Sequence, residues 1–121
     1  MVKRASHRPE QVAETVRQVV AEVLTREVRD PRVNRVTVTS VRVSPDLSHA
    51  AVRVVVGDPA ERERALEGLE SAAGFLRSRV AKALSTRVVP ELAFEIDRGI
   101  EHAHRIDTLL NSLRRDEGGE A

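Results

Sequence analysis

The chain has 121 residues, 40% of them hydrophobic and 32% charged, which is the composition of a single globular domain with one hydrophobic core. It contains no cysteine, which excludes disulfides and thiolate zinc sites and is typical of a reducing compartment. No apolar run approaches the roughly 20 residues of a membrane span, and no apolar segment follows the basic start, so we expect a cytoplasmic protein without a signal peptide.

The net charge of +1 gives no indication of nucleic-acid binding, but the charges are unevenly distributed along the chain. Residues 1–56 carry ten Lys and Arg against six Asp and Glu, whereas residues 86–121 carry five against eight. Residues 71–90 contain four basic side chains and no acidic one. This distribution indicates an oriented electrostatic surface, basic in the first part of the chain and acidic at its end.

Residues 9–28 place valine and leucine at helical spacing, which predicts a helix that begins at Pro9 and ends before Pro31. The apolar period then changes to two, which predicts a β-hairpin with its turn in the stretch SPDLSH. The alternation of the first strand slips at Ser40, so we expect a bulge there.

The second half of the chain begins with a helix for which Asp58 is the expected N-cap and Pro59 the first residue. Gly74 interrupts the helical pattern, and a further helix with an apolar stripe follows it as far as Leu84. Alternating apolar residues after Pro90 predict a third strand, which begins at an edge or a bulge because proline cannot donate to a sheet ladder. A last helix should bury the stripe formed by Ala103, Ile106, Leu109, Leu110 and Leu113.

The predicted order is therefore α-β-β-α-α-β-α, which indicates an α+β domain with helices packed against a three-stranded sheet. No internal repeat or low-complexity linker divides the sequence. We expect residues 1–115 to form this single domain and residues 116–121 to form a disordered tail.

Gly74 is the most informative position, because glycine in a helix interior costs about 1 kcal/mol relative to alanine. A break between two helices there would expose the N–H groups that begin the second helix, and such groups attract phosphate. The small side chains of Ala72 and Ala73 would let a sugar–phosphate strand come close. Three basic residues would add electrostatic attraction: Arg77, Arg79 and Lys82. Alternatively, Gly74 relieves crowding where two helices cross, and local physics does not separate these two interpretations.

The sequence contains neither a known catalytic motif nor a glycine-rich phosphate loop, so we expect no enzyme and no cofactor. His102 and His104 are the candidate metal ligands, but residues two apart on a helix point about 200° from each other, so we interpret them as surface residues. Asp30, Asp46 and Asp97 are interpreted as turn formers. With two phenylalanines and no tyrosine or tryptophan, the chain lacks aromatic platforms for stacking bases, so any RNA contact would depend on phosphates and backbone shape.

Several stretches together resemble one known family. They are, in chain order, HRPEQVAETV, REVRDPRV, VTSVRVSPDLSHAAVRV, SAAGFLRSRVAKAL and RVVPELAFEID. DPRV near the first strand, an A-x-G kink followed by FLR, and the pattern R-x-x-P-E-L-x-F-x-x-D form a combination similar to that of bacterial ribosome-binding factor A. The resemblance covers roughly residues 7–110 and implies a type II KH-like domain, in which a kink at Ala72, Ala73 and Gly74 replaces the usual GxxG clamp.

This resemblance implies a non-enzymatic assembly factor that binds immature small ribosomal subunits and their rRNA late in maturation. It further implies a link to processing of the rRNA 5′ end, support of growth in the cold, and departure helped by a ribosome-associated GTPase; we expect a monomer. Because the acidic end is short, we expect no contacts of the kind that the longer extension of some family members would make. The residues implied for rRNA contact are Ala72, Ala73, Gly74, Arg77, Arg79, Lys82 and Arg87, together with the N-terminal Lys3, Arg4 and Arg8. The residues implied to hold the fold instead are Asp30, Pro31, Pro90, Glu91 and Leu92.

The leading hypothesis is a KH-type rRNA-binding assembly factor. Glutamate in place of Arg77, Arg79 and Lys82 should then abolish association with the subunit while leaving the fold intact. The alternative is an α/β domain that dimerises or binds protein through its sheet or its last helix, without touching RNA. An enzyme is the third possibility and has no motif in its favour.

Overall fold

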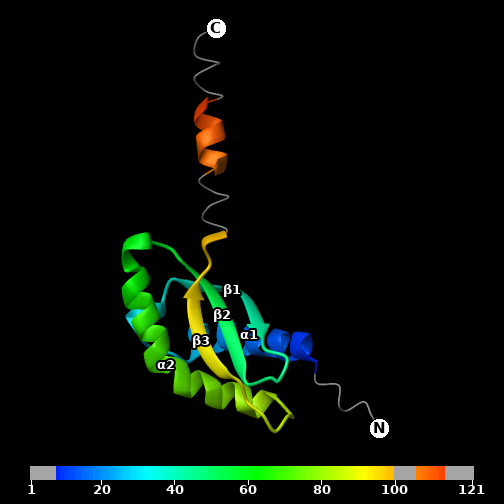
Figure 1. Ribbon diagram of the computed structural model, residues 1–121. Coiled ribbons are helices and arrows are strands. Elements are labelled where there is room, and N and C mark those ends of the chain that lie inside the picture. The colour runs from blue at the N-terminus through cyan, green and yellow to red at the C-terminus, as the bar shows by residue number, and fades with distance from the viewer. Residues whose placement is uncertain (1–7, 100–105, 114–121) are drawn as a thin grey trace.

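The structure, a computed structural model, describes residues 8–99 and 106–113. Its elements are α1 (Pro9–Arg26), the 3₁₀ turn η2 (Pro31–Val33), β1 (Val36–Val43), β2 (His49–Val56), the 3₁₀ turn η3 (Pro59–Glu61), α2 (Arg62–Ala83) and β3 (Glu91–Ile96). The three strands form one sheet in the order β1-β2-β3, and α1 and α2 pack against one face of it (Figure 1). The predicted α+β class and the three-stranded sheet are confirmed.

One apolar stripe of α1 enters the core. Its residues recur every three or four positions, so they fall on one side of the helix: Val12, Val16, Val20, Val23 and Leu24. Removing each such side chain from water contributes about 1.5–3 kcal/mol, which is why this amphipathic pattern decides the orientation of the helix. The helix begins at Pro9 as predicted and ends at Arg26, slightly before the predicted end.

The central strand is β2, and its inward side chains are at most 8% exposed: Ala50, Val52, Val54 and Val56. This strand pairs antiparallel with β1 and parallel with β3. The register between β1 and β2 shifts between Val38 and Ser40, so the predicted bulge is confirmed. Because β2 is central, β1 and β3 each keep one edge that no strand of the described residues covers.

Two Asp-Pro pairs start the two 3₁₀ turns. The carboxylate of Asp30 accepts the N–H of Arg32 at 3.0 Å, and that of Asp58 accepts the N–H of Ala60 at the same distance. The predicted cap at Asp58 is thus present, but the helix that it caps is η3, which leads directly into α2. Arg32 also pairs with Asp30 at 2.7 Å, and this hydrogen bonding lowers the pKa of the Asp30 carboxyl.

α2 runs without interruption from Arg62 to Ala83, so the predicted break into two helices at Gly74 is wrong. The cost of one glycine, about 1 kcal/mol, is small beside the burial of Leu69 and Leu76 on the same helix. Figure 1 shows α2 changing direction part of the way along its length, so the kink is a bend within one helix.

The glycine that the packing requires is Gly68. A Cβ atom at Gly68 would lie 2.9 Å from Val33 Cγ1 and 3.0 Å from Arg32 Cβ, because α2 crosses η2 there. At Gly74 no atom lies within 4 Å of the corresponding position. The second interpretation of Gly74, relief of crowding at a helix crossing, is therefore also wrong, and the close approach lies elsewhere in the same helix.

Residues 106–113 are helical, but the predicted burial of their apolar stripe is wrong. The large side chains are 44 to 60% exposed: Ile106, Leu109, Leu110 and Leu113. Helical periodicity identifies an apolar face but does not specify what covers it. Ala103 and the expected tail at 116–121 lie outside the described residues. None of the described helices is both long enough and apolar enough to span a membrane.

The turn between β1 and β2 is organised by Asp46. Its carboxylate accepts hydrogen bonds from the Ser48 hydroxyl at 2.7 Å, the Ser44 hydroxyl at 2.8 Å and the Ser48 N–H at 3.0 Å. These bonds favour the ionised carboxylate and lower the pKa of Asp46 from 3.8 to about 2. They also enclose Leu47, whose φ of 66° is a left-handed conformation that is costly for leucine.

The two glycines of α2 should respond oppositely to alanine. Gly68→Ala should lower the free energy of unfolding by about 1–3 kcal/mol, because the new methyl group overlaps Val33. Gly74→Ala should raise it by about 0.5–1 kcal/mol, because alanine is the better helix former and meets no neighbour. Urea unfolding of the two variants measures both values. A change of the same sign in both would contradict this assignment.

The Asp46 turn should stabilise the fold only above a certain pH. Since the pKa of Asp46 is about 2 in the folded chain and its ordinary value is 3.8, the stabilisation is complete above pH 3.8 and is lost as the pH falls towards 2. The difference in unfolding free energy between the unchanged protein and Asp46→Ala should shrink over this interval. An NMR titration of the Asp46 carboxyl carbon measures the pKa directly, and Ser48→Ala should raise it. A midpoint at the ordinary value would show that the hydrogen bonds are absent in solution.

Candidate nucleic-acid interface

A groove of about 340 Å³ separates α2 from the free side of β3. The helix contributes Ala73, Gly74 and Arg77 to its walls. The strand wall and the end of the groove consist of Glu91, Leu92, Ala93 and His49, the last from the start of β2. The wall at Gly74 is bare backbone with no atom within 4 Å of the position that a Cβ would take, so an extended chain can approach α2 closely there.

Of the three predicted small residues, two lie in this groove. Ala73 and Gly74 line it, whereas Ala72 is partly buried against the hydrophobic core. Because α2 is continuous, the backbone N–H groups near Gly74 belong to the interior of a helix, where each is hydrogen-bonded to a carbonyl one turn earlier. The predicted anion site of exposed N–H groups is therefore wrong, and what remains is a bare surface.

Arg77 holds the groove together. Its Nε donates to the carbonyl of Pro90 at 3.2 Å, and its Nη2 donates to the carbonyl of Val89 at 2.7 Å. Both carbonyls belong to the loop immediately before β3, so the guanidinium group fixes the start of that strand against α2. Arg77 is thus a structural residue with part of its charge still exposed, and it is not a free phosphate ligand.

Arg79 points to the other side of α2, because residues two apart on a helix are separated by about 200°. Its Nη2 lies 2.6 Å from Glu27 Oε1, beside the end of α1, and its Cζ lies 4.9 Å from the centre of the Phe75 ring. The Nε atom is buried and has no hydrogen-bond partner within residues 8–99 and 106–113. Arg79 therefore connects α1 to α2, and the predicted basic set does not form one continuous surface.

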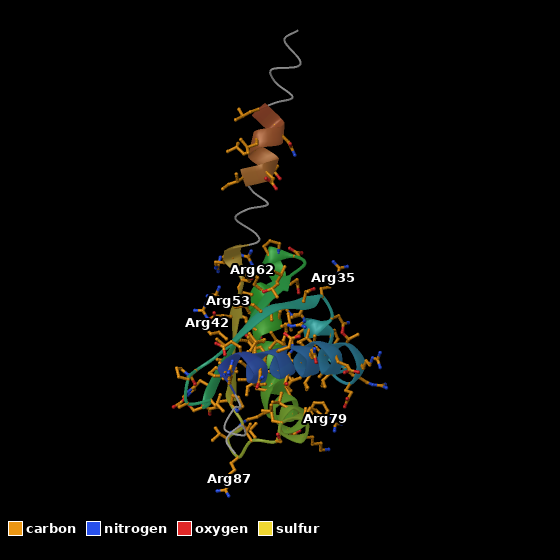
Figure 2. All side chains as sticks on the ribbon, turned by 90° about the vertical axis from the view of Figure 1, so that its right-hand side faces the viewer. Arg35, Arg42, Arg53, Arg62, Arg79 and Arg87 are labelled. Carbon is orange, nitrogen blue, oxygen red and sulfur yellow. The ribbon has the colours of Figure 1, made fainter. Side chains whose placement is uncertain are left out.

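Lys82 and Arg87 remain as exposed cations outside the lining of this groove. Both are exposed, and neither has an ion-pair partner in the part of the chain that the structure describes. Lys82 lies in the last turn of α2, and Arg87 lies in the loop that leads to β3. Figure 2 shows Arg87 projecting from the end of the domain, well apart from Arg79. These two residues are the predicted basic side chains best placed to meet a phosphate.

The predicted N-terminal basic set is only partly visible. Arg8 is exposed immediately before α1, and its carbonyl oxygen accepts the N–H of Val12 at 3.1 Å. Lys3 and Arg4 lie outside the described residues. The same is true of His102 and His104, the metal candidates that were interpreted as surface residues. Within residues 8–99 and 106–113, no group of three His, Asp or Glu side chains is placed to hold a metal ion.

Two residues of the groove were not anticipated. His49 Nε2 lies 3.7 Å from Glu91 Oε1, so an imidazole and a carboxylate stand at the mouth of the groove. Glu91 had been interpreted as a residue that holds the fold. The alternation of β3 could have placed it on the outer face with Ala93, but its proximity to His49 depends on the parallel pairing of β2 with β3. That pairing has no local signal in the sequence.

The sequence and the fold match those of known proteins. Residues 8–110 match the family described as Ribosome-binding factor A. A curated relative of that name from Rhodopirellula baltica is 44% identical over 95% of this chain and 85% of its own length. Another, from Thermomicrobium roseum, is 46% identical over 92% of this chain and 87% of its own length.

Solved structures agree with this match. The crystal structure of ribosome-binding factor A from Thermus thermophilus is 28% identical, with a TM-score of 0.68 over 75% of this chain and 97% of that one. A solution structure of a Thermotoga maritima protein described as a putative ribosome binding factor A is 33% identical, with a TM-score of 0.57 over 77% of this chain and 86% of that one.

A third structure is a Thermus thermophilus homology model fitted into a cryo-EM map of a 30S complex of that protein. It is 30% identical, with a TM-score of 0.59 over 70% of this chain and 90% of that one. These likenesses are consistent with the KH-like fold that the sequence resemblance implied. With a family match over most of its length and relatives above 40% identity, the chain belongs to the ribosome-binding factor A family.

Proposed function

We propose that the chain is a non-enzymatic assembly factor that binds the small ribosomal subunit and its rRNA. The observation that carries this proposal is the fitted 30S complex of a relative that shares the fold and 30% of the sequence. The absence of a catalytic motif from the sequence agrees with a binding role. We infer that the groove between α2 and β3, together with Lys82 in the last turn of α2 and Arg87 in the loop before β3, is the surface that meets rRNA.

The geometry supports binding of the RNA backbone over binding of stacked bases. The helix wall at Ala73 and Gly74 is small enough for a sugar–phosphate strand to lie against it. Phe75 is 41% exposed, but Arg79 already occupies one face of its ring, so it is not a free stacking platform. Affinity would then come mainly from phosphate contacts and should fall steeply with salt.

The finer parts of the proposal rest on the family resemblance. They are binding to immature subunits late in maturation, a link to processing of the rRNA 5′ end, and support of growth in the cold. Release by a ribosome-associated GTPase, action as a monomer and a cytoplasmic location belong to the same set. We also propose that Lys3, Arg4 and Arg8 add phosphate contacts, because they place basic charge ahead of α1.

One observation favours the alternative function, a domain that binds protein. The apolar face of residues 106–113 is exposed, and such a face is commonly covered by a partner. The two functions are compatible, because this helix and the groove beside β3 are different surfaces. A salt-resistant protein complex that persists after removal of RNA would support the alternative.

The double variant Lys82→Glu and Arg87→Glu should weaken binding to small subunits about tenfold or more. The binding constant should also fall less steeply with salt concentration, by the amount expected for the loss of roughly two phosphate contacts. Neither side chain has an ion-pair partner among the described residues, so the unfolding free energy should stay unchanged. Co-sedimentation with immature subunits over a range of salt concentrations measures both effects. The matched control is Arg29→Glu with Arg35→Glu, which alters the same charge at exposed positions on either side of η2, away from the end of α2 and the loop before β3. Equal weakening by both pairs would contradict the assignment of the groove.

Replacement of Arg79 should lower the stability of the fold more than it weakens rRNA binding. The sequence-based expectation was that its replacement leaves the fold intact. Arg79→Met should lower the free energy of unfolding by about 1 kcal/mol, because it removes a partly exposed ion pair and a cation–π contact. A double-mutant cycle with Glu27→Gln isolates the ion pair, and its coupling energy should be about 0.5–1 kcal/mol. A coupling energy of zero, together with weaker subunit binding by Arg79→Met, would indicate that Arg79 contacts rRNA.

A further inference from the structure

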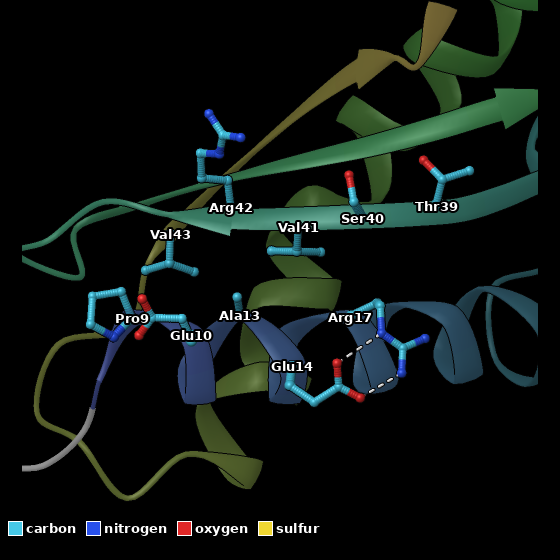
Figure 3. Close-up of a pocket in the computed structure, with 10 residues that line it drawn as sticks. All are labelled: Pro9, Glu10, Ala13, Glu14, Arg17, Thr39, Ser40, Val41, Arg42 and Val43. Carbon is cyan, nitrogen blue, oxygen red and sulfur yellow. Dashed lines mark hydrogen bonds and ion pairs between the residues drawn. The ribbon is translucent and has the colours of Figure 1, made fainter. Parts of the chain in front are cut away.

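The sheet has a second free edge, and a groove lies between this edge and α1. It is formed by the first half of α1 and by residues 39–43 of β1, and its volume is about 560 Å³ (Figure 3). It is thus larger than the groove beside α2, whose volume is about 340 Å³. The proposed rRNA surface uses the β3 edge, so nothing described so far occupies this one.

The backbone of β1 is available in this groove. The N–H of Ser44 donates to the carbonyl of His49 at 2.9 Å, which identifies these two residues as a hydrogen-bonded pair of the hairpin. Hydrogen-bonded pairs alternate along antiparallel strands, so Val41 and Val43 direct their N–H and C=O groups away from β2 and towards the groove. No described residue hydrogen-bonds to these outward groups. An unpaired edge of this kind accepts an extended chain as an additional strand.

The bulge limits where a strand can be added. The register of β1 shifts between Val38 and Ser40, and a bulge bends the strand and interrupts the regular spacing of its outward groups. Strand addition is therefore confined to the segment from Ser40 to Val43, which is the part that lines the groove. The bulge is fixed from the far side of the sheet, because the Thr39 hydroxyl donates to Asp97 Oδ2 at 2.7 Å.

The helix wall of the groove carries Glu10, Glu14 and Arg17, and one of its two carboxylates has no cation beside it in the described part of the chain. Glu14 is engaged by Arg17, whose Nε and Nη2 lie 3.0 and 2.5 Å from its carboxylate oxygens, whereas Glu10 has no partner among the described residues. Figure 3 shows Val41 and Val43 pointing towards α1 and Arg42 pointing away from it. Between strand and helix, the groove thus presents an apolar floor at Ala13 and the two valines, flanked by an uncompensated carboxylate.

We propose that this groove binds an extended, basic segment of another protein, which pairs with β1 as a fourth strand and places a Lys or Arg side chain at Glu10. The uncompensated carboxylate of Glu10 disfavours RNA, because it would repel phosphate, whereas Glu14 is neutralised by Arg17. Glu10 favours a cationic side chain, which gains attraction and directs the register of the added strand. The partner's identity rests on the proposed function, since a protein held against rRNA is itself rich in Lys and Arg.

The groove can be probed with the full chain and a short capped peptide of alternating valine and arginine. Amide hydrogen exchange measured by NMR should slow at Val41 and Val43 when the peptide binds. It should not change at Val36, whose N–H also points away from β2 but which lies beyond the bulge. Glu10→Arg should weaken the peptide about tenfold. The matched control, Glu22→Arg, lies on the same helix outside the groove and should have no effect. Unchanged exchange at Val41 and Val43, or equal weakening by both variants, would overturn the proposal.

The natural partner can be identified by crosslinking, because the chain has no cysteine and a single introduced one can be labelled uniquely. Ser40→Cys, carrying a photo-crosslinker, should join to a Lys- and Arg-rich protein segment on immature small subunits. Ala81→Cys, exposed on α2 next to Lys82, is the comparison variant and should join to rRNA. A crosslink from position 40 to rRNA, to a second copy or to the chain's own residues 1–7 would overturn the proposal. Loss of co-sedimentation by the unmodified protein would instead refute the proposed function.

Discussion

The parallel pairing of β2 with β3 is the constraint on which the rest of the structure depends. Parallel neighbours require a long crossover, and α2 provides it. The 22 residues of α2 span about 33 Å, whereas the six residues of β3 span about 20 Å. The helix is therefore longer than the strand that it leads to. By bending, as Figure 1 shows, it keeps Ala65 near its start and Val80 near its end buried, and a groove is left beside β3.

Arginine side chains hold this crossover in place, so part of the basic charge in residues 71–90 is used in contacts within the fold. Arg77 binds two carbonyls ahead of β3, and Arg79 binds Glu27 beside the end of α1. Guanidinium groups suit this task because several donors in one plane can engage more than one acceptor. Charge counted along the sequence therefore overstates the charge available to a ligand. At the end of α2, it is Lys82 and Arg87 that stay available for phosphates.

The two edges of the sheet differ in the charge beside them, and the proposed partners differ accordingly. The loop that leads to β3 carries Arg87 and follows Lys82, although Glu91 lines the groove beside this edge. The β1 edge lies beside the carboxylate of Glu10, which is unpaired among the described residues, and the ion pair of Glu14 with Arg17. A factor that sits on a nucleoprotein particle meets both anionic RNA and cationic protein. A three-stranded sheet with both edges open can bind RNA beside one edge and protein along the other.

Features that depend on local backbone chemistry were determined by the sequence alone: the helix starting at Pro9, the bulge at Ser40, the cap at Asp58 and the strand beginning after Pro90. Apolar period, proline geometry and side-chain capping act within a few residues, and the family motifs are equally local. The tertiary structure decided which glycine is close-packed, which arginines are already bound, and that His49 meets Glu91. Each of these depends on a contact between residues far apart in the chain, and local patterns carry no information about such contacts.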